Sequence, residues 1–319
     1  EKVLQEKIMQ EKIVKSIVEC QKENGWLGNG YHGGNKNAGQ YTNMEAGVKY
    51  LAEKGVRKDS DALKRAMGAF KELPNTDPCY RGTWNINDEF KYAANGANLF
   101  RCACIARAGY ENYIDIKPQI QLALDSFKRV LEVDSILDIT RLVKKGTKRV
   151  FNNFEKWPCR YHLDILAHTN SWKTEENSKM IAKAVHKIMR TDRPELVGVH
   201  ADSWVGYVLG TCGCFPSQGF KVVDMADGIP HYHMEYLVWL ARCGAVKYSL
   251  ELQKIVKTIY DSVNEEGICE IAVHDYIFKD WGTYAGLQLE VDWKSKTKRN
   301  CDITFRALQL CYYAGINID

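Results

Sequence analysis

The chain has 319 residues, a net charge of +4 and 45% hydrophobic residues. This length fits one large domain or two ordinary ones, and the hydrophobic content is enough to build a sizeable core. The positive excess is small and spread along the chain, so nothing in the composition points to nucleic acid as a partner. No apolar run reaches the roughly 18 residues of a membrane span, and the sequence therefore predicts no transmembrane helix.

The cysteines and the first residues suggest a cellular compartment. There are 11 cysteines, an odd number, and the N-terminal stretch is charged and amphipathic, unlike a secretory signal. We therefore expect a cytoplasmic protein with mostly free thiols. The densest basic run comprises Arg141, Lys144, Lys145, Lys148 and Arg149. We interpret it as a solvated helix face and loop, with an anion or partner site as the alternative.

Residues 3–22 are typical of one class of predicted helix. Between residues 3 and 22, apolar side chains recur every three or four positions, which is typical of a helix with one buried face. Charged residues occupy the opposite face. The other segments of this class are 61–73, 117–133, 135–145, 176–190 and 247–263.

A second class of segment alternates with the first. It is richer in Gly, Ala, Cys and aromatic residues and poorer in Lys and Glu, which indicates burial on more than one side. Most of these segments end at a glycine, which suits the left-handed conformation just beyond a helix. The segments are 43–54, 92–108, 160–168, 202–212, 231–243 and 302–314, and the glycines are Gly55, Gly109, Gly213, Gly244 and Gly315.

The alternation of two helix classes predicts the architecture. We expect a single all-α domain over residues 1–319, an α/α toroid in which a double ring contains about six helical hairpins. The small-residue helices would form the inner ring, and their N-terminal ends would open onto a shared cavity. A plain helical solenoid is the alternative.

A short turn recurs near both ends of the chain. The first copy reads Gln21-Lys-Glu-Asn-Gly25-Trp26, and the second reads Asn264-Glu-Glu-Gly267-Ile268. The first copy resembles the Gln-x-x-x-Gly-x-Trp repeat of the terpenoid cyclase and protein prenyltransferase superfamily, with one residue fewer between Gly and Trp. The second resembles a more degenerate copy. The resemblance implies an α/α toroid and covers the two ends of the chain better than its middle.

The catalytic motifs of that superfamily are mostly missing. The Asp-x-Asp-Asp acid of class II cyclases is absent, and Asp224-Met-Ala-Asp227 has the wrong spacing. The class I Asp-Asp-x-x-Asp motif is also absent. Zinc-dependent prenyltransferases use an Asp-x-Cys pair and a histidine on a helix; Asp77-Pro-Cys79 lies too far upstream, whereas His233 resembles the histidine. The cofactor is therefore unknown, and zinc has no full ligand set.

The densest polar cluster runs from Pro230 to Tyr236. His231 and Glu235 are four residues apart and share a helix face, while His233 points elsewhere. An imidazole next to a carboxylate can act as an oriented base or bind a metal, and it can also only fix a helix end. We assign the acid–base work to Asp227, His231, His233 and Glu235.

Two further clusters begin inner helices. Arg160, Tyr161 and His162 follow Pro158, a residue favoured in the first turn of a helix. They could exchange a proton or hold a carboxylate. Asp202 is a good N-cap residue and lies two positions before Trp204. Both clusters could equally be structural.

The remaining candidates are predicted to line the cavity. A Gly/Asn-rich loop from Gly28 to Tyr41 contains His32 and has no phosphate-binding pattern, so we expect a flexible lip over the mouth. The predicted catalytic residues are His231, His233, Glu235, Asp227, His162 and Tyr161. The predicted substrate-binding residues are Arg160, Asp202, Trp204, Tyr232, Asp302 and His32.

These features favour an enzyme that transforms a small molecule in a central aromatic cavity. The resemblance implies an apolar or prenyl-like substrate, handled by acid–base or electrostatic catalysis. A carbohydrate-active lyase or hydrolase on the same toroid is one alternative, because Arg160, Tyr161 and His162 suit proton abstraction from a uronate. A non-catalytic ring that binds a peptide or a partner protein is another. The sequence does not indicate an oligomeric state.

Overall fold

The fold is taken from a computed structural model. It describes residues 2–28, 43–76, 97–143, 148–152, 155–190, 197–198, 231–272 and 289–316. Helices dominate this part of the chain, which confirms the all-α prediction, and the only strands in it form one small three-stranded sheet. None of the described helices combines the length and apolar composition needed to cross a bilayer.

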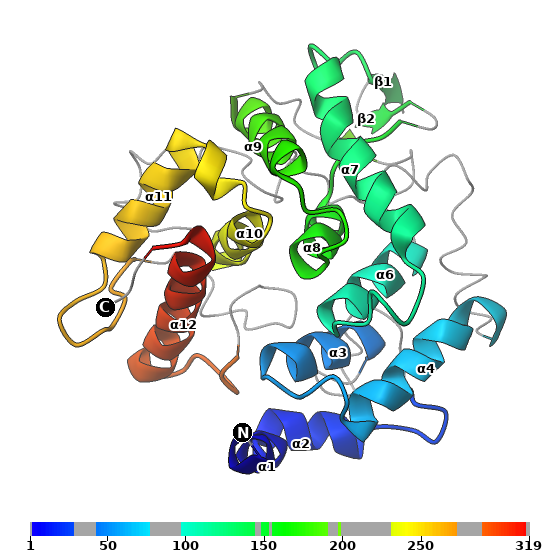
Figure 1. The fold of residues 1–319 in the computed structure, drawn as a ribbon, viewed down its shortest axis with the longest axis vertical. Coiled ribbons are helices and arrows are strands. Elements are labelled where there is room, and N and C mark those ends of the chain that lie inside the picture. Colours follow the sequence, from blue (N-terminus) through cyan, green and yellow to red (C-terminus); the bar gives the residue numbers. More distant parts are fainter. Residues whose placement is uncertain are drawn as a thin grey trace.

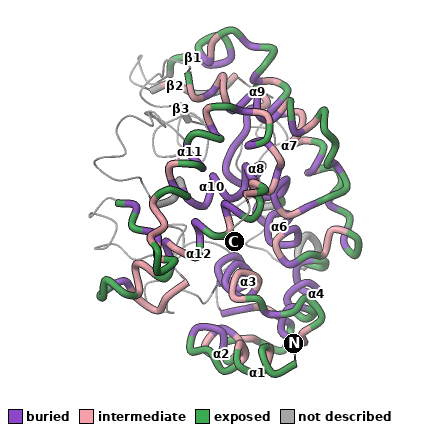
Figure 2. Tube along the Cα trace, turned by 60° about the vertical axis from the view of Figure 1, so that its left-hand side comes forward, coloured by how far each residue is buried: buried purple, intermediate pink, exposed green. Residues whose placement is uncertain are grey.

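One class of helix exposes a polar face. Figure 2 shows α2, α7 and α11 with buried and exposed residues alternating along them, as the three/four spacing predicts. In α2, only Ile13, Val14 and Ile17 are buried. The members of this class are α1 (Lys2–Gln10), α2 (Lys12–Glu19), α4 (Asp61–Thr76), α7 (Lys117–Glu132), α9 (Glu175–Arg190) and α11 (Leu250–Asp261).

The other class is buried on nearly all sides, except that its last member, Lys296–Ala314, buries one face only and leaves Tyr312 exposed, contrary to the prediction for 302–314. In α3, residues 44–51 are all buried, and in α8 only the last residue is not. Small residues permit this close approach. The members are α3 (Met44–Glu53), α6 (Ala97–Arg107), α8 (Arg160–His168), α10 (His231–Arg242) and α12 (Lys296–Ala314). Gly55, Gly109, Gly244 and Gly315 follow four of them with positive φ, as predicted.

The buried helices are neighbours in chain order. α3 packs on α6, α6 on α8, α8 on α10 and α10 on α12. Figure 1 shows these five around the middle of the molecule, with α2, α4, α7, α9 and α11 on their outer side. The segment 202–212, predicted as a sixth inner helix, lies outside the described residues. A short 3-10 helix, η3 (Val246–Tyr248), connects α10 to α11.

The two turns that repeat in the sequence have the same backbone structure. Turns 21–27 and 263–269 are each closed by an antiparallel bridge between their first and last residues. Gly25 and Gly267 occupy the same position in them, with φ of 88° and 76°. The repeat found in the sequence is therefore a repeat of local structure.

The amide side chains of the two turns are not equivalent. The N–H of Lys22 in the first turn and the N–H of Asn264 in the second make the same hydrogen bond across the turn, so Asn264 matches Lys22. Gln21 lies one position earlier, and its Nε2 donates to the carbonyl of Ala62 in α4 at 2.8 Å. Asn264 instead accepts the N–H of Ile268 with its side-chain oxygen, at 3.0 Å. Gln21 and Asn264, the first residues of the two turn sequences, therefore do not occupy equivalent positions.

The helix predicted over 135–145 is wrong. Residues Thr140–Val143 form strand β1, antiparallel to β2 (Lys148–Phe151), and β3 (Val197–Gly198) pairs with β2 in parallel. Local side-chain bonds replace the helix before β1, because Asp138 accepts the N–H of Ser135 at 3.0 Å. The basic residues of this region therefore lie on a hairpin and not on a helix face, as far as they are described.

Two other helix limits differ from the prediction. Residues 3–22 form two helices, because the backbone is extended at Glu11 (φ −55°, ψ 135°). The last inner helix does not begin at Asp302. It begins six residues earlier, after Ser295, whose hydroxyl accepts the N–H of Lys298.

The cysteines that the structure describes are all free thiols, as predicted. Burial raises the pKa of Cys102 and of Cys243 to about 12. Cys20 and Cys301 are exposed. Since the thiolate is the reactive form, we expect iodoacetamide near neutral pH to label Cys20 and Cys301 and to spare Cys102 and Cys243 in the native protein. Peptide mass spectrometry after brief labelling checks this, and labelling of Cys243 at the rate of Cys301 would contradict it.

Candidate functional site

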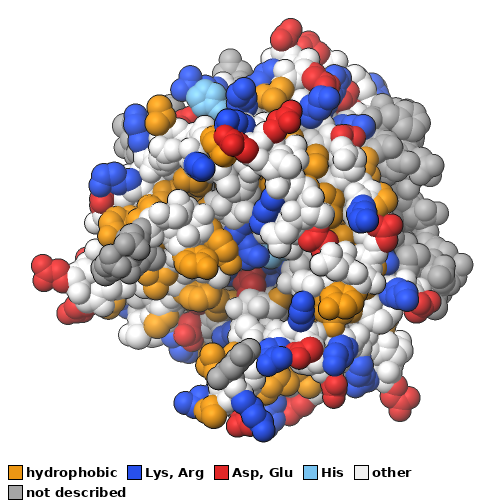
Figure 3. Space-filling model, in the orientation of Figure 1, with side chains coloured by type: hydrophobic (Ala, Val, Ile, Leu, Met, Phe, Trp, Pro, Cys, Tyr) orange, Lys and Arg blue, Asp and Glu red, His pale blue; other side chains and the backbone are white. Residues whose placement is uncertain are grey.

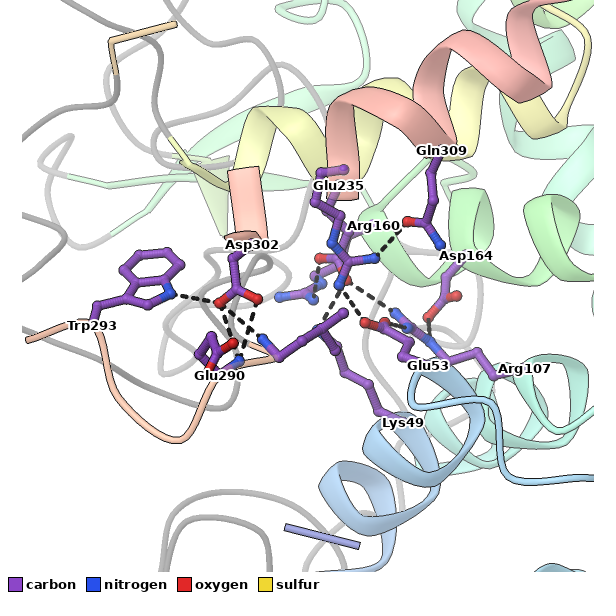
Figure 4. Close-up of polar contacts among 12 residues, drawn as sticks. Lys49, Glu53, Arg107, Arg160, Asp164, Glu235, Glu290, Trp293, Asp302 and Gln309 are labelled. Carbon is purple, nitrogen blue, oxygen red and sulfur yellow. Dashed lines mark hydrogen bonds and ion pairs between the residues drawn. The ribbon is translucent and has the colours of Figure 1, made fainter. Parts of the chain in front are cut away.

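The buried helices carry charged side chains that meet in the interior. Charged groups are rarely buried unless they are paired or functional. Figure 4 shows such side chains from α3, α6, α8 and α10 pointing toward one another. We call them the central ion network: Lys49 and Glu53 on α3, Arg107 on α6, Arg160 and Asp164 on α8, Glu235 on α10 and Arg306 on α12.

Arg107 joins three carboxylates from three other helices. Its Nε donates to Asp164 Oδ2 and its Nη1 donates to Glu53 Oε1, both at 2.7 Å. Its Nη2 lies 3.6 Å from Glu235 Oε1. The guanidinium plane also lies 4.9 Å from the ring centre of Trp239, so its face is covered as well. Arg107 is therefore fixed on every side.

The cations keep two of these carboxylates ionised. Burial opposes ionisation of Glu53, but Arg306, Lys49 and Arg107 outweigh it and hold the pKa of Glu53 far below its ordinary value. Burial also opposes ionisation of Asp164, and Arg107 again lowers its pKa. Both side chains are therefore anions at neutral pH.

Glu235 is surrounded by cations. Lys49 Nζ lies 2.9 Å from its Oε1, and Arg160 Nη2 lies 3.5 Å from its Oε2. The side chain of Glu235 is 2% exposed. With Arg107, three cations from α3, α6 and α8 thus face one carboxylate on α10. Glu235 and Arg160 are among the candidates predicted from the sequence, whereas Lys49 and Arg107 are not.

The network also joins the last inner helix to the first. Arg306 on α12 donates to Glu53 on α3, although 253 residues separate them in the chain. Its Nη1 donates to Gln309 Oε1 at 3.0 Å. This ion pair links the two helices at the ends of the series α3, α6, α8, α10 and α12, in which each helix packs on the next.

Tyr161 and Glu45 form a second polar pair in the interior. The Tyr161 hydroxyl donates to Glu45 Oε1 at 2.8 Å, and both side chains are buried. The Arg160 guanidinium lies 5.4 Å from the Tyr161 ring centre, which places a cation next to the pair. A phenol bonded to a carboxylate beside a cation is an arrangement that can move a proton.

His162 has a structural position. It is 1% exposed, and its Nδ1 accepts the N–H of Cys159, the residue that caps α8. Burial lowers the pKa of His162 to about 4, so the ring is neutral at physiological pH. Its predicted role as a catalytic acid or base finds no support in this geometry.

Because the His162 ring is buried and neutral, it makes the free energy of unfolding depend on pH. The unfolded chain binds a proton at His162 near pH 6.5 and the folded chain near pH 4, so this group loses its contribution as pH falls through that window. The loss should reach about 3 kcal/mol. His162→Gln should keep the cap, because glutamine accepts at this helix position, and should flatten the pH dependence between 4 and 6.5. Urea unfolding across this range measures it, and an unchanged slope would contradict the assignment.

Asp302 binds a loop rather than a cation. Trp293 Nε1 donates to its Oδ2 at 2.6 Å, and the N–H groups of Leu289 and Glu290 donate to the carboxylate as well. Burial raises the pKa of Asp302 to about 6, although these donors oppose the rise. Within the described ranges no ion pair joins Asp302 to a cation. Its geometry is that of an anchor for residues 289–293, and its predicted contact with a substrate stays a prediction.

His168 forms a further interior pair with Asp164. Its Nδ1 lies 2.9 Å from both the main-chain oxygen and Oδ1 of Asp164. Burial lowers the pKa of His168, helped by the nearby charge of Arg242, so the ring is neutral. His168 is the last residue of α8.

Several predicted site residues are outside the described part of the chain. His32, Asp202, Trp204 and Asp227 lie in undescribed segments. His231, Tyr232 and His233 form the first turn of α10, as predicted, but their side chains are not described. Their proposed roles therefore remain predictions. In the described residues, no three His, Cys, Asp or Glu side chains are grouped as metal ligands.

Figure 3 shows basic and acidic atoms in a hollow near the middle of one face, between hydrophobic side chains. The five inner helices surround the same place in Figure 1. This arrangement can hold a polar group between fixed charges and can exchange protons through a tyrosine. Comparisons with protein-family models, with curated proteins and with solved structures gave no match to the chain.

Proposed function

We propose that the chain is an α/α toroid of the kind found in terpenoid cyclases and protein prenyltransferases, and that it transforms a small molecule at the centre of the ring. The order of contacts among the inner helices and the Arg306–Glu53 pair support the ring. The matching turns near the two ends support the superfamily. The central ion network supports a site at the centre.

The charged interior favours a polar substrate over a hydrocarbon. The buried aromatic residues of α10 contact other side chains. Tyr236 and Trp239 pack edge to face at 5.4 Å, and Trp239 also meets the ring of His168 and the guanidinium of Arg107. The observation that carries the proposal is the convergence of four helices, α3, α6, α8 and α10, on Glu235 and Arg107. These charges are already paired with one another, so a hydrocarbon would gain nothing from them, whereas a polar substrate would interact with them.

The chemistry we propose is acid–base catalysis by Tyr161 with Glu45. The carboxylate would accept the phenolic proton, and Arg160 would stabilise the phenolate that forms. This mechanism matches the lyase alternative better than the cyclase one, because it requires removal of a proton and no strong acid. It assigns no part to His162.

The test compares two Tyr→Phe variants of the full chain. Wild type is incubated with a metabolite extract, and substrate loss and product gain are followed by mass spectrometry. Tyr161→Phe should lower turnover by about 10²–10⁴-fold. Tyr110→Phe, which removes only a hydroxyl bonded to the main chain of Lys58, should retain it. Equal turnover of the two variants, or no turnover and no co-purified molecule in native mass spectra of wild type, would reject the proposal.

A further inference from the structure

Helix α12 has an apolar face that is exposed to solvent, in addition to the face that packs into the core. Its residues are spaced four, three and four positions apart, so they form one row along the helix. They are Cys301, Phe305, Leu308 and Tyr312, and all four are exposed, Tyr312 to 73%. The row is about 16 Å long. Single exposed apolar residues are ordinary, but a continuous row of them indicates a contact surface.

The most exposed ring of the row is held in place by its neighbours. The rings of Tyr312 and Tyr313 meet edge to face, with their centres 5.1 Å apart. The ring of Tyr313 is in turn covered by the guanidinium of Arg242 in α10, whose central carbon lies 4.8 Å from the ring centre. A tyrosine supported in this way loses little conformational freedom when a partner covers it, which suits it as an anchor of an interface.

The row is complementary to itself. Cys301 and Tyr312 lie equally far from the midpoint of the row, and so do Phe305 and Leu308. A second α12 laid antiparallel across the first therefore places Phe305 of each copy against Leu308 of the other, and Cys301 of each against Tyr312 of the other. A contact about a two-fold axis requires this kind of self-complementary surface.

The charges of α12 favour the same antiparallel arrangement. Its first turn contains Lys296, Lys298 and Arg299 and no acidic residue, although cations oppose the dipole at that end of a helix. Of these cations, Lys298 pairs with Asp292 at 2.9 Å. In an antiparallel pair, the basic first turn of each copy lies beside the C-terminal end of the other α12, where the helix dipole is negative. A parallel pair would instead bring the two basic turns together.

We infer that the exposed row of α12 is a dimer interface, through which two copies of this chain associate with their α12 helices antiparallel. The two-fold axis passes between Phe305 and Leu308. One pair of helices buries less than the roughly 1,600 Å² of a standard interface, so the dimer is weak and forms as the protein concentration rises. The inference concerns a surface outside the central ion network and does not depend on the proposed enzyme.

Sedimentation velocity of the full chain over a concentration series tests the dimer. The average mass of wild type should rise from that of one chain toward that of two. Leu308→Glu should stay monomeric throughout, because the dimer would bury the added charge. Leu250→Glu is the matched control, since Leu250 is 77% exposed but lies on α11, and it should dimerise as wild type does. A monomeric wild type, or equal loss of the dimer in both variants, would overturn the inference.

Cross-linking tests the direction of the two helices and needs no charged variant. Tyr312→Cys places a thiol opposite Cys301 of the second copy. A bismaleimide shorter than the roughly 16 Å between these positions within one helix should join residue 301 of one copy to residue 312 of the other, as peptide mass spectrometry can show. Tyr312→Cys/Cys301→Ser should lose this link. Links of 301 to 301 and of 312 to 312 would mean a parallel pair, and these links, or no link between copies, would overturn the inference.

Discussion

Glu235→Gln is expected to destabilise the protein by about 3–5 kcal/mol, the usual result of removing one partner from a buried ion network. The change is nearly isosteric, so packing is kept and only the charge is lost. Lys49, Arg107 and Arg160 would then face one another without the carboxylate that separates them. Urea unfolding followed by circular dichroism measures the loss.

Two further variants serve as controls for the Glu235→Gln prediction. Glu175→Gln removes an exposed carboxylate paired with Lys179 within one helix, and it should leave the urea midpoint unchanged. The double variant Glu235→Gln/Lys49→Met removes a charge of each sign and should be more stable than Glu235→Gln alone. If the single Glu235 variant unfolds at the wild-type midpoint, the network does not hold the inner helices together.

The helices were predictable because a buried helix face requires apolar residues at regular spacing in the sequence. The charged faces of α7, α9 and α11 and the small residues of α3, α6 and α10 each follow from local composition. The failure at 135–145 has a local cause. The spacing of apolar residues there is that of a helix. Hydrogen bonds from the side chains of Asp138 and Thr140 to the main chain instead favour a turn and a strand.

The site was only partly predictable. Arg160, Tyr161 and Glu235 were found because they lie in polar clusters of the sequence. Lys49, Arg107 and Arg306 were missed because each stands alone among apolar neighbours, and their pairing depends on contacts between distant segments. A signal was nevertheless present. A lone charged residue inside a helix that is otherwise built for burial needs a partner of opposite charge, which the other lone charged residues of this kind can supply.

Gly25→Ala is expected to cost about 2–5 kcal/mol, far more than the same change at the matching position of the second turn. Gly25 has a φ of 88°, and an added Cβ would overlap the main-chain oxygen of Arg65 in α4 and lie 2.7 Å from its carbonyl carbon. That oxygen belongs to a helix, so relief requires α4 to move. The first turn therefore needs glycine for both its conformation and its packing.

Gly267→Ala is the matched control. Gly267 occupies the same position in the second turn, but no helix main chain lies next to it among the described residues. Its φ is 76°, and among the described residues nothing lies within 4 Å of an added Cβ. Only the backbone strain remains, which predicts a loss of about 1–2 kcal/mol. Urea unfolding of the two variants compares them directly. Equal losses would mean that the turn at 21–27 is not packed against α4, and the contact of Gln21 with Ala62 would then be in doubt as well.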